Sequence, residues 1–194
     1  MIQLKTRWAD QVSTVAPLPE YPRPNMVRDS YLNLNGQWEY AMSSEAAVSA
    51  YDGNILVPFS PETLMSGVQK ILQPGEYLHY HKTFSLPEGF KKNRVLLHFG
   101  AVDYECIAYV NGQKAGYHKG GYVSFKFEVT HLVREGENVI TVNAMDDVRD
   151  TLVPRGKQSE LYHSHDCDYT RTTGIWQTVW LEFTPVEYIK STHI

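Results

Sequence analysis

Residues 104–117 read YECIAYVNGQKAGY, and this stretch decides the fold. Residues that favour strands flank the dipeptide Asn111-Gly112 on both sides. Because Asn and Gly both tolerate a positive φ, this dipeptide is typical of a two-residue hairpin turn. The stretch therefore predicts two antiparallel strands, over 104–110 and 113–117.

A period of two recurs outward from this hairpin, and a period near 3.6 is nearly absent. In 94–99 the side chains of Val95, Leu97 and Phe99 share one face, and 125–129 alternates apolar with charged residues. Both segments are expected to have one solvent-exposed side. Further strands are expected over 38–41, 55–57, 77–86, 138–145 and 179–183. Many short strands with few helices predict an all-β fold, a jelly-roll β-sandwich.

Composition narrows the class of protein. The chain has 194 residues, of which 42% are hydrophobic and 21% charged, and a net charge of -4. One domain is the expectation for this length. No run of Lys or Arg forms a basic stripe, and the apolar runs are short, so we expect neither nucleic acid nor a membrane as a partner. Residues 1–8 lack the apolar core of a signal peptide, and two cysteines build no disulfide framework, which favours a cytoplasmic location.

Two stretches interrupt the strands. Residues 6–25 contain four prolines, which hold the chain extended, so this part is expected to wrap the sandwich as an arm. Residues 146–173 are polar and too long for an ordinary hairpin connection, and loops of this length are usually functional. We expect an arm over 1–20, a sandwich domain over 21–185, and over 186–194 the start of a linker.

Eight motifs follow one another from about Tyr21 to Glu182. They are PRP (22–24), LNGQW (34–38), VPFSPE (57–62) with SGV (66–68), LLHFGAVDY (96–104), VNG (110–112), GYHKGGY (116–122), PRGKQ (154–158) and GIWQTVWLE (174–182). In this order they resemble the sugar-binding domain that opens members of glycoside hydrolase family 2. The motifs agree with the strands and turns placed above.

The resemblance implies a parent enzyme in which this jelly roll precedes an immunoglobulin-like domain and a (β/α)8 barrel. Family members hydrolyse β-glycosides with retention, using two carboxyl groups about 5 to 5.5 Å apart, both on the barrel. The family's acid/base glutamate follows an asparagine, and no asparagine here precedes Glu. The chain alone is therefore predicted to be inactive. Residues 168–175 look more like the β-galactosidase branch than the β-glucuronidase branch.

The resemblance also implies a role for Asp168, six positions before Gly174. An Asp at this offset reaches into the active site in similar family enzymes and helps to hold the terminal sugar. The alternative is that Asp168 only caps a turn. Arg155, Lys157 and Arg171 could bind the carboxylate of a sugar acid, which makes them further substrate-binding candidates. Alternatively, these cations order the loop by pairing with Asp146, Asp147, Asp150 or Asp166.

The segment from His163 to Asp168 resembles a metal cluster. In an extended chain His163, His165 and Cys167 would share a face, and His79 and His81 could approach them. Because no second matching pair of ligands lies nearby in the sequence, we expect no metal and no cofactor.

Three tryptophans could stack on a sugar. Trp38 and Trp176 are expected to serve in core or inter-domain packing instead. Trp180 alternates with Val179 and Leu181, so it should face away from them, where a neighbouring domain could cover it.

Two other functions remain open: a stand-alone carbohydrate-binding module, and a purely structural or oligomerisation domain. The expected partners are a β-glycoside, bound through the full-length enzyme, and the downstream domains of the same chain. Whether the parent enzyme forms a homo-oligomer is left open.

Overall fold

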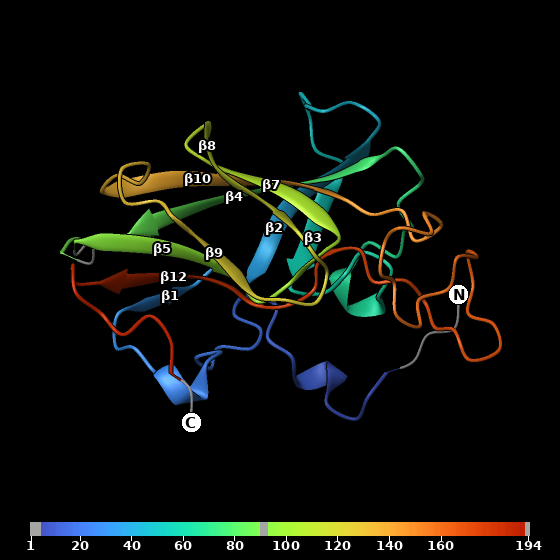
Figure 1. The fold of residues 1–194 in the computed structure, drawn as a ribbon, viewed down its shortest axis with the longest axis horizontal. Helices are drawn as coiled ribbons and strands as arrows, with labels where there is room; N and C mark the ends of the chain where they lie inside the picture. The colour runs from blue at the N-terminus through green and yellow to red at the C-terminus, as the bar shows by residue number, and fades with distance from the viewer. Residues whose placement is uncertain (1–4, 90–92, 193–194) are drawn as a thin grey trace.

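Two antiparallel sheets packed face to face form the body of the protein (Figure 1). The computed structural model describes residues 5–89 and 93–192. One sheet has the order β3 (Gly53–Val57), β2 (Gly36–Ser43), β4 (Tyr77–Leu86), β10 (Gly136–Met145), β7 (Glu105–Val110), β8 (Gln113–Lys119). The other has the order β1 (Tyr31–Asn33), β12 (Val179–Thr184), β5 (Arg94–Phe99), β9 (Phe125–Glu128).

Short elements complete the fold. Strands β6 (Val102–Asp103) and β11 (Gly174–Ile175) form a small pair of their own. The helical residues of the described part lie in three 3-10 turns, η1 (Ala9–Gln11), η2 (Pro24–Met26) and η3 (Leu64–Ser66). None of these helices is long and apolar enough to cross a membrane. The all-β sandwich expected from the sequence is confirmed.

The predicted hairpin at Asn111-Gly112 joins β7 to β8. Val110 pairs with Gln113, and the turn residues have φ values of 50° and 78°. A bulge between Ala108 and Tyr109 shifts the register farther along the ladder. The local prediction is therefore correct, since this dipeptide adopts the left-handed conformation that a two-residue turn requires.

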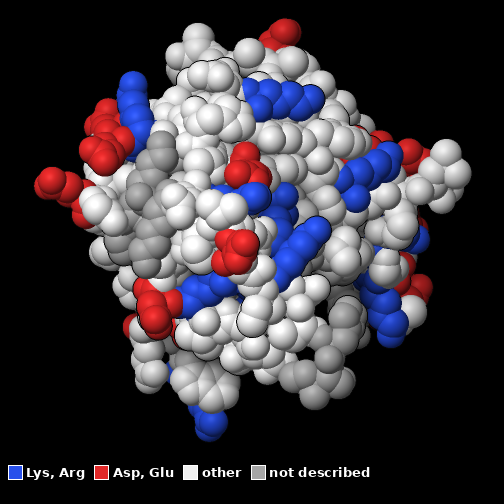
Figure 2. All heavy atoms as spheres, turned by 60° about the vertical axis from the view of Figure 1, so that its left-hand side comes forward, with Lys and Arg blue, Asp and Glu red and all other residues white. Residues whose placement is uncertain are grey.

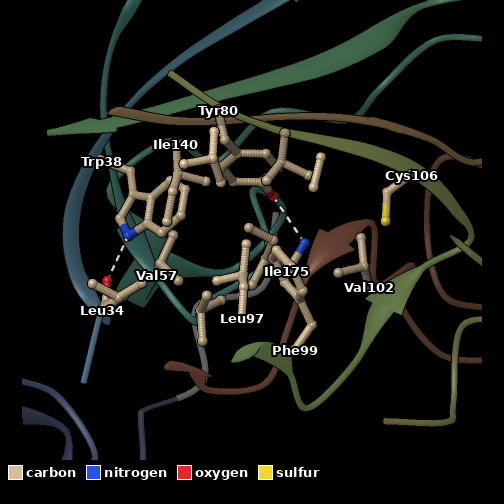
Figure 3. Close-up of a cluster of buried hydrophobic side chains, with 14 of the residues drawn as sticks. Leu34, Trp38, Val57, Tyr80, Leu97, Phe99, Val102, Cys106, Ile140 and Ile175 are labelled. Carbon is tan, nitrogen blue, oxygen red and sulfur yellow. Dashed lines mark hydrogen bonds between the residues drawn. The ribbon is translucent and has the colours of Figure 1, made fainter. Parts of the chain in front are cut away.

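The core fills the space between the two sheets (Figure 3). The indole Nε1 of Trp38 donates to the carbonyl oxygen of Leu34 at 2.8 Å. The hydroxyl of Tyr80 accepts a 3.0 Å hydrogen bond from the backbone N–H of Ile175. A Cβ on Gly174 would lie 2.3 Å from that hydroxyl, and the φ of Gly174 is +70°. Only glycine fits there, so the return of the long loop into the sandwich is fixed at this point.

The outer face of the four-stranded sheet is covered, which corrects the expectation of one solvent-exposed side for residues 94–99. Leu96 and His98 are as well buried as Val95, Leu97 and Phe99 on the inner face. Trp180 is 2% exposed and stacks on His98, with ring centroids 4.7 Å apart. The cover is the chain's own N-terminal segment and not another domain.

Glu182 fastens that segment to the sheet. Its carboxylate is fully buried and accepts hydrogen bonds from Tyr21, Arg23, Arg28 and Trp180. Burial works to raise the pKa of Glu182, but the hydrogen bond and charge of His98 and the bonds from Trp180 and Tyr21 hold this pKa below its ordinary value. A period-two pattern could not reveal this cover, because its partners lie about 160 residues apart.

Charges of both signs are interspersed over the face drawn in Figure 2. Among the residues coloured there, basic and acidic side chains stand close together and much of the surface is uncharged. This face therefore has no broad patch of only positive or only negative charge.

Candidate functional site

The loop over residues 146–173 builds the candidate site. It leaves the sheet after β10 and returns at β11, and Gln158 anchors its middle. The buried amide of Gln158 donates to Oδ2 of Asp103 at 2.7 Å and to the hydroxyl of Tyr122 at 3.1 Å. Its Oε1 accepts a 2.7 Å bond from the backbone N–H of Thr172. The loop is thus tied to the end of the sandwich from within.

Beside this anchor lies a cleft of about 230 Å³. Its lining combines aromatic, cationic and hydrogen-bonding side chains: Asp103, Tyr122, Lys157, Gln158, Tyr169, Thr170, Thr172 and Trp176. Trp176 is partly exposed, and its indole Nε1 donates to the carbonyl of Gly121 at 2.8 Å. Such a mixture suits a ligand that has both apolar faces and hydroxyl groups.

Asp168 sits at the end of a tight turn near the cleft. The backbone N–H groups of His165 and Asp168 each donate to the other residue's carbonyl, at 3.1 and 2.8 Å. Asp166 has a φ of 47°, which closes the turn. The side chain of Asp168 is 24% exposed, and the next residue, Tyr169, lines the cleft.

The three predicted cations take different roles. Arg155 bonds Glu160 at 2.5 Å and the carbonyl of Gln158 at 2.8 Å. Arg171 is 5% exposed and donates to two backbone carbonyls, those of Leu72 and Glu160. Both arginines therefore order the loop, and the charge of Arg171 also acts on Asp146, one of the four aspartates considered from the sequence. Lys157 is exposed, lines the cleft and makes no salt bridge in the described part of the chain.

Three buried carboxyl groups lie under the loop, and the sequence showed them only as members of motifs or of a polar run. Burial raises the pKa of Asp103 to about 6, and the hydrogen bond from Gln158 opposes this shift. Burial raises the pKa of Glu62 to about 7, against hydrogen bonds from Thr173. Burial, together with the charges of Asp103 and Glu62, raises the pKa of Asp146 to about 7.

One of these groups has an unmatched atom. Oε1 of Glu62 has no hydrogen-bond partner among the described residues. An unpartnered buried oxygen favours the neutral carboxyl group, in agreement with the raised pKa. No local signal identifies these acids, because their burial comes from the packing of distant segments.

The residues that the sequence offered as possible metal ligands, and that we did not expect to bind a metal, do not all come together. His163 and Cys167 are exposed and only His165 turns inward, toward Glu160 and Asp168. His79 bonds Asn143 and the carbonyl of Glu45, and His81 pairs with Glu39. The alternation that placed His163, His165 and Cys167 on one face fails because the segment bends into a turn.

Two of the tryptophans are buried by packing within the chain. Trp38 is a core residue at 1% exposure, as expected. Trp180, which a neighbouring domain could have covered, is buried with Arg23 of the N-terminal segment over its ring.

A β-sandwich whose longest loop builds an aromatic and polar cleft at one end has the form of a ligand-binding jelly-roll domain. The chain belongs to the family described as glycosyl hydrolases family 2, sugar binding domain, whose profile matches residues 61–185. This confirms the resemblance drawn from the eight motifs.

The relatives that this chain matches are much longer than the chain itself. A β-galactosidase of Thermoanaerobacter pseudethanolicus is 34% identical over 116 residues, which are 59% of this chain and 14% of that protein. A putative β-glucuronidase of Formosa agariphila is 26% identical over 167 residues, 84% of this chain and 19% of that protein. The structure of a β-glucuronidase from an uncultured Clostridium shares the fold, with a TM-score of 0.62, 24% identity and coverage of 84% of this chain and 30% of that one.

Proposed function

We propose that this chain is the non-catalytic sugar-binding and support domain of a retaining β-glycosidase. The carboxylate of Asp168 would enter the sugar site of the longer enzyme, and the two reactive carboxyl groups would come from another part of the protein. The family membership supports the first statement, and the sequence, in which no asparagine precedes Glu, supports the second.

The observation that carries the proposal is the placement of Asp168. Paired backbone hydrogen bonds hold its turn, its side chain keeps access to solvent, and its neighbour Tyr169 lines the cleft. An ionised carboxylate can accept hydrogen bonds from two adjacent sugar hydroxyls, each contributing about 1.5–3 kcal/mol. A rigid loop residue can thus contribute substantially to sugar binding at a site completed by other domains.

The test uses the full-length protein with Asp168→Asn and nitrophenyl β-galactoside as the substrate. We expect kcat/KM to fall about tenfold or more, which corresponds to about 1.4 kcal/mol of lost transition-state binding. Asp166→Asn is the matched control, because Asp166 is exposed at the tip of the same turn and Asn also tolerates its positive φ. An unchanged kcat/KM in Asp168→Asn would favour a purely structural role for the domain.

Lys157 separates two classes of substrate. Its ammonium group is the cation in the cleft that the described structure leaves without a salt bridge. If the parent enzyme takes glucuronides, Lys157→Met should lower kcat/KM on nitrophenyl β-glucuronide. If it takes galactosides, as residues 168–175 favour, the same variant should keep its activity on the galactoside.

A further inference from the structure

A cluster of metal-ligating side chains lies next to the cleft, and two of its three members, Glu160 and His165, have no part in the proposed function. One ligand atom from each of Glu160, His165 and Asp168 lies within 4.8 Å of the other two. Nε2 of His165 is 3.8 Å from Oε1 of Glu160 and 3.9 Å from Oδ2 of Asp168. These separations are too long for hydrogen bonds and leave space for an ion between the atoms.

The backbone explains why these three side chains meet. His165 and Asp168 face each other across the tight turn, so their side chains project from the same side. Gln158 pairs with Tyr169 in a parallel bridge, in which the backbone N–H of Ser159 donates to the carbonyl of Tyr169 at 2.8 Å. Glu160 therefore emerges beside the turn.

Hydrogen bonds fix the orientation of the imidazole ring of His165. The hydroxyl of Ser159 donates its one proton to the carbonyl of His163 at 2.8 Å. It can therefore only accept from Nδ1 of His165, which lies 2.9 Å away. Nδ1 therefore carries a ring proton, and Nε2 lies on the side of the two carboxylates. This arrangement is typical of a histidine ligand held by a second partner.

The neighbouring arginine leaves the cluster open. Nη1 of Arg155 bonds Oε2 of Glu160 at 2.5 Å, whereas Oε1 is the oxygen nearer to His165. An imidazole that ligates a metal is neutral, so the two carboxylates and the guanidinium around it sum to one negative charge, which favours a cation.

We propose that Glu160, His165 and Asp168 bind a zinc ion, with water completing its coordination. Zinc accepts imidazole nitrogen and carboxylate oxygen at about 2.0–2.2 Å, so tetrahedral ligands lie about 3.4 Å apart. The two distances from Nε2 need to shorten by about half an ångström, which partly exposed side chains can accommodate. The site was not expected from the sequence, because Glu160 supplies a ligand in place of His163 or Cys167.

The ion would act on Asp168 as well. With Oδ2 on zinc, Oδ1 remains free to accept a hydrogen bond from a sugar hydroxyl. The zinc site goes beyond the proposed function and shares Asp168 with it, whereas His165 and Glu160 have no role in holding the sugar there.

The test is a calorimetric titration of the metal-stripped protein with zinc chloride. We expect one zinc per chain, and His165→Ala should weaken binding about tenfold or more, because even outer partners of metal ligands are worth that much. Glu160→Gln should weaken it too, while His163→Ala, the exposed control two residues from His165, should change it less than about twofold. Circular dichroism without zinc checks that each variant is folded.

Several results would overturn the proposal. They are no saturable binding to the unaltered protein, an affinity unchanged by His165→Ala, or equal competition by calcium, which avoids imidazole nitrogen. His165→Ala retains Asp168, so hydrolysis by this variant separates loss of the zinc site from failure of the proposed function.

Discussion

The side-chain amide of Gln158 donates a 2.7 Å hydrogen bond to Oδ2 of Asp103, fifty-five residues away in the chain. Both residues are buried, although both also belong to the lining of the cleft. The same amide also reaches Tyr122 and Thr172. One side chain therefore joins the long loop, strand β6 and the wall of the cleft.

Replacing this side chain should destabilise the fold. Gln158→Leu leaves the buried carboxyl of Asp103 without its partner, and an unsatisfied buried group costs about 1–3 kcal/mol. Urea unfolding should show that loss in the free energy of unfolding. Gln113→Leu, at an exposed position of β8, should change it by less than about 0.5 kcal/mol. Equal effects of the two variants would contradict the anchoring role.

Stability should fall as the pH rises from mildly acidic to neutral. Glu62, Asp103 and Asp146 have pKa values raised by burial to about 7, 6 and 7, so the folded chain keeps protons that the unfolded chain has released. Their stabilising contribution is complete below the ordinary carboxyl pKa and is lost as the pH passes the raised values. Each group can add a slope of up to about 1.4 kcal/mol per pH unit within that window. Urea unfolding at pH 5, 6, 7 and 8 measures it.

Glu62→Gln provides the control for this slope. The amide keeps an acceptor for the backbone N–H of Thr173 but carries no ionisable group. The slope of stability against pH should therefore decrease by the contribution of one titrating group. Glu135→Gln, in an exposed turn, should leave the slope unchanged. A stability that does not fall between pH 5 and pH 8 would show that these acids are already ionised in the folded protein.

Glu182 should be among the most sensitive positions of the four-stranded sheet. Glu182→Gln removes a buried charge bonded to Arg23 and Arg28, and breaking such a pair costs about 3–5 kcal/mol. The N-terminal segment should then detach and become susceptible to limited proteolysis. Glu128→Gln on β9 breaks only an exposed pair with Arg94 and should cost less than about 1 kcal/mol. An intact segment in Glu182→Gln would mean that apolar contacts alone hold it.

The two cysteines should differ sharply in reactivity. Cys167 is exposed, whereas burial raises the pKa of the Cys106 thiol to about 12. Because the thiolate is the reactive form, a thiol reagent should modify one cysteine quickly in the folded protein and the second only after unfolding. Cys167→Ser should abolish the fast phase. Rapid modification of both thiols would indicate that β7 opens locally.

Local patterns were enough to predict the longer strands and the hairpin at Asn111-Gly112. Their signals lie within a few residues, where side-chain alternation and φ preferences act directly. The short strands β1, β6 and β11 were not predicted, because a segment of two or three residues shows no periodicity. For the segment from His163 to Asp168, side-chain alternation applies only to an extended chain, and the positive φ of Asp166 bends this segment into a turn.

The sequence by itself determined the sandwich, its main strands and the family, since these depend on period-two alternation, turn residues and motif order. Tertiary structure alone decided that the N-terminal segment covers Trp180, that Arg171 lies inside the loop, and that Glu160 joins His165 and Asp168. The reason is physical. Burial and pairing depend on which distant segments the stacked sheets and the loop bring into contact, and no local preference records that choice.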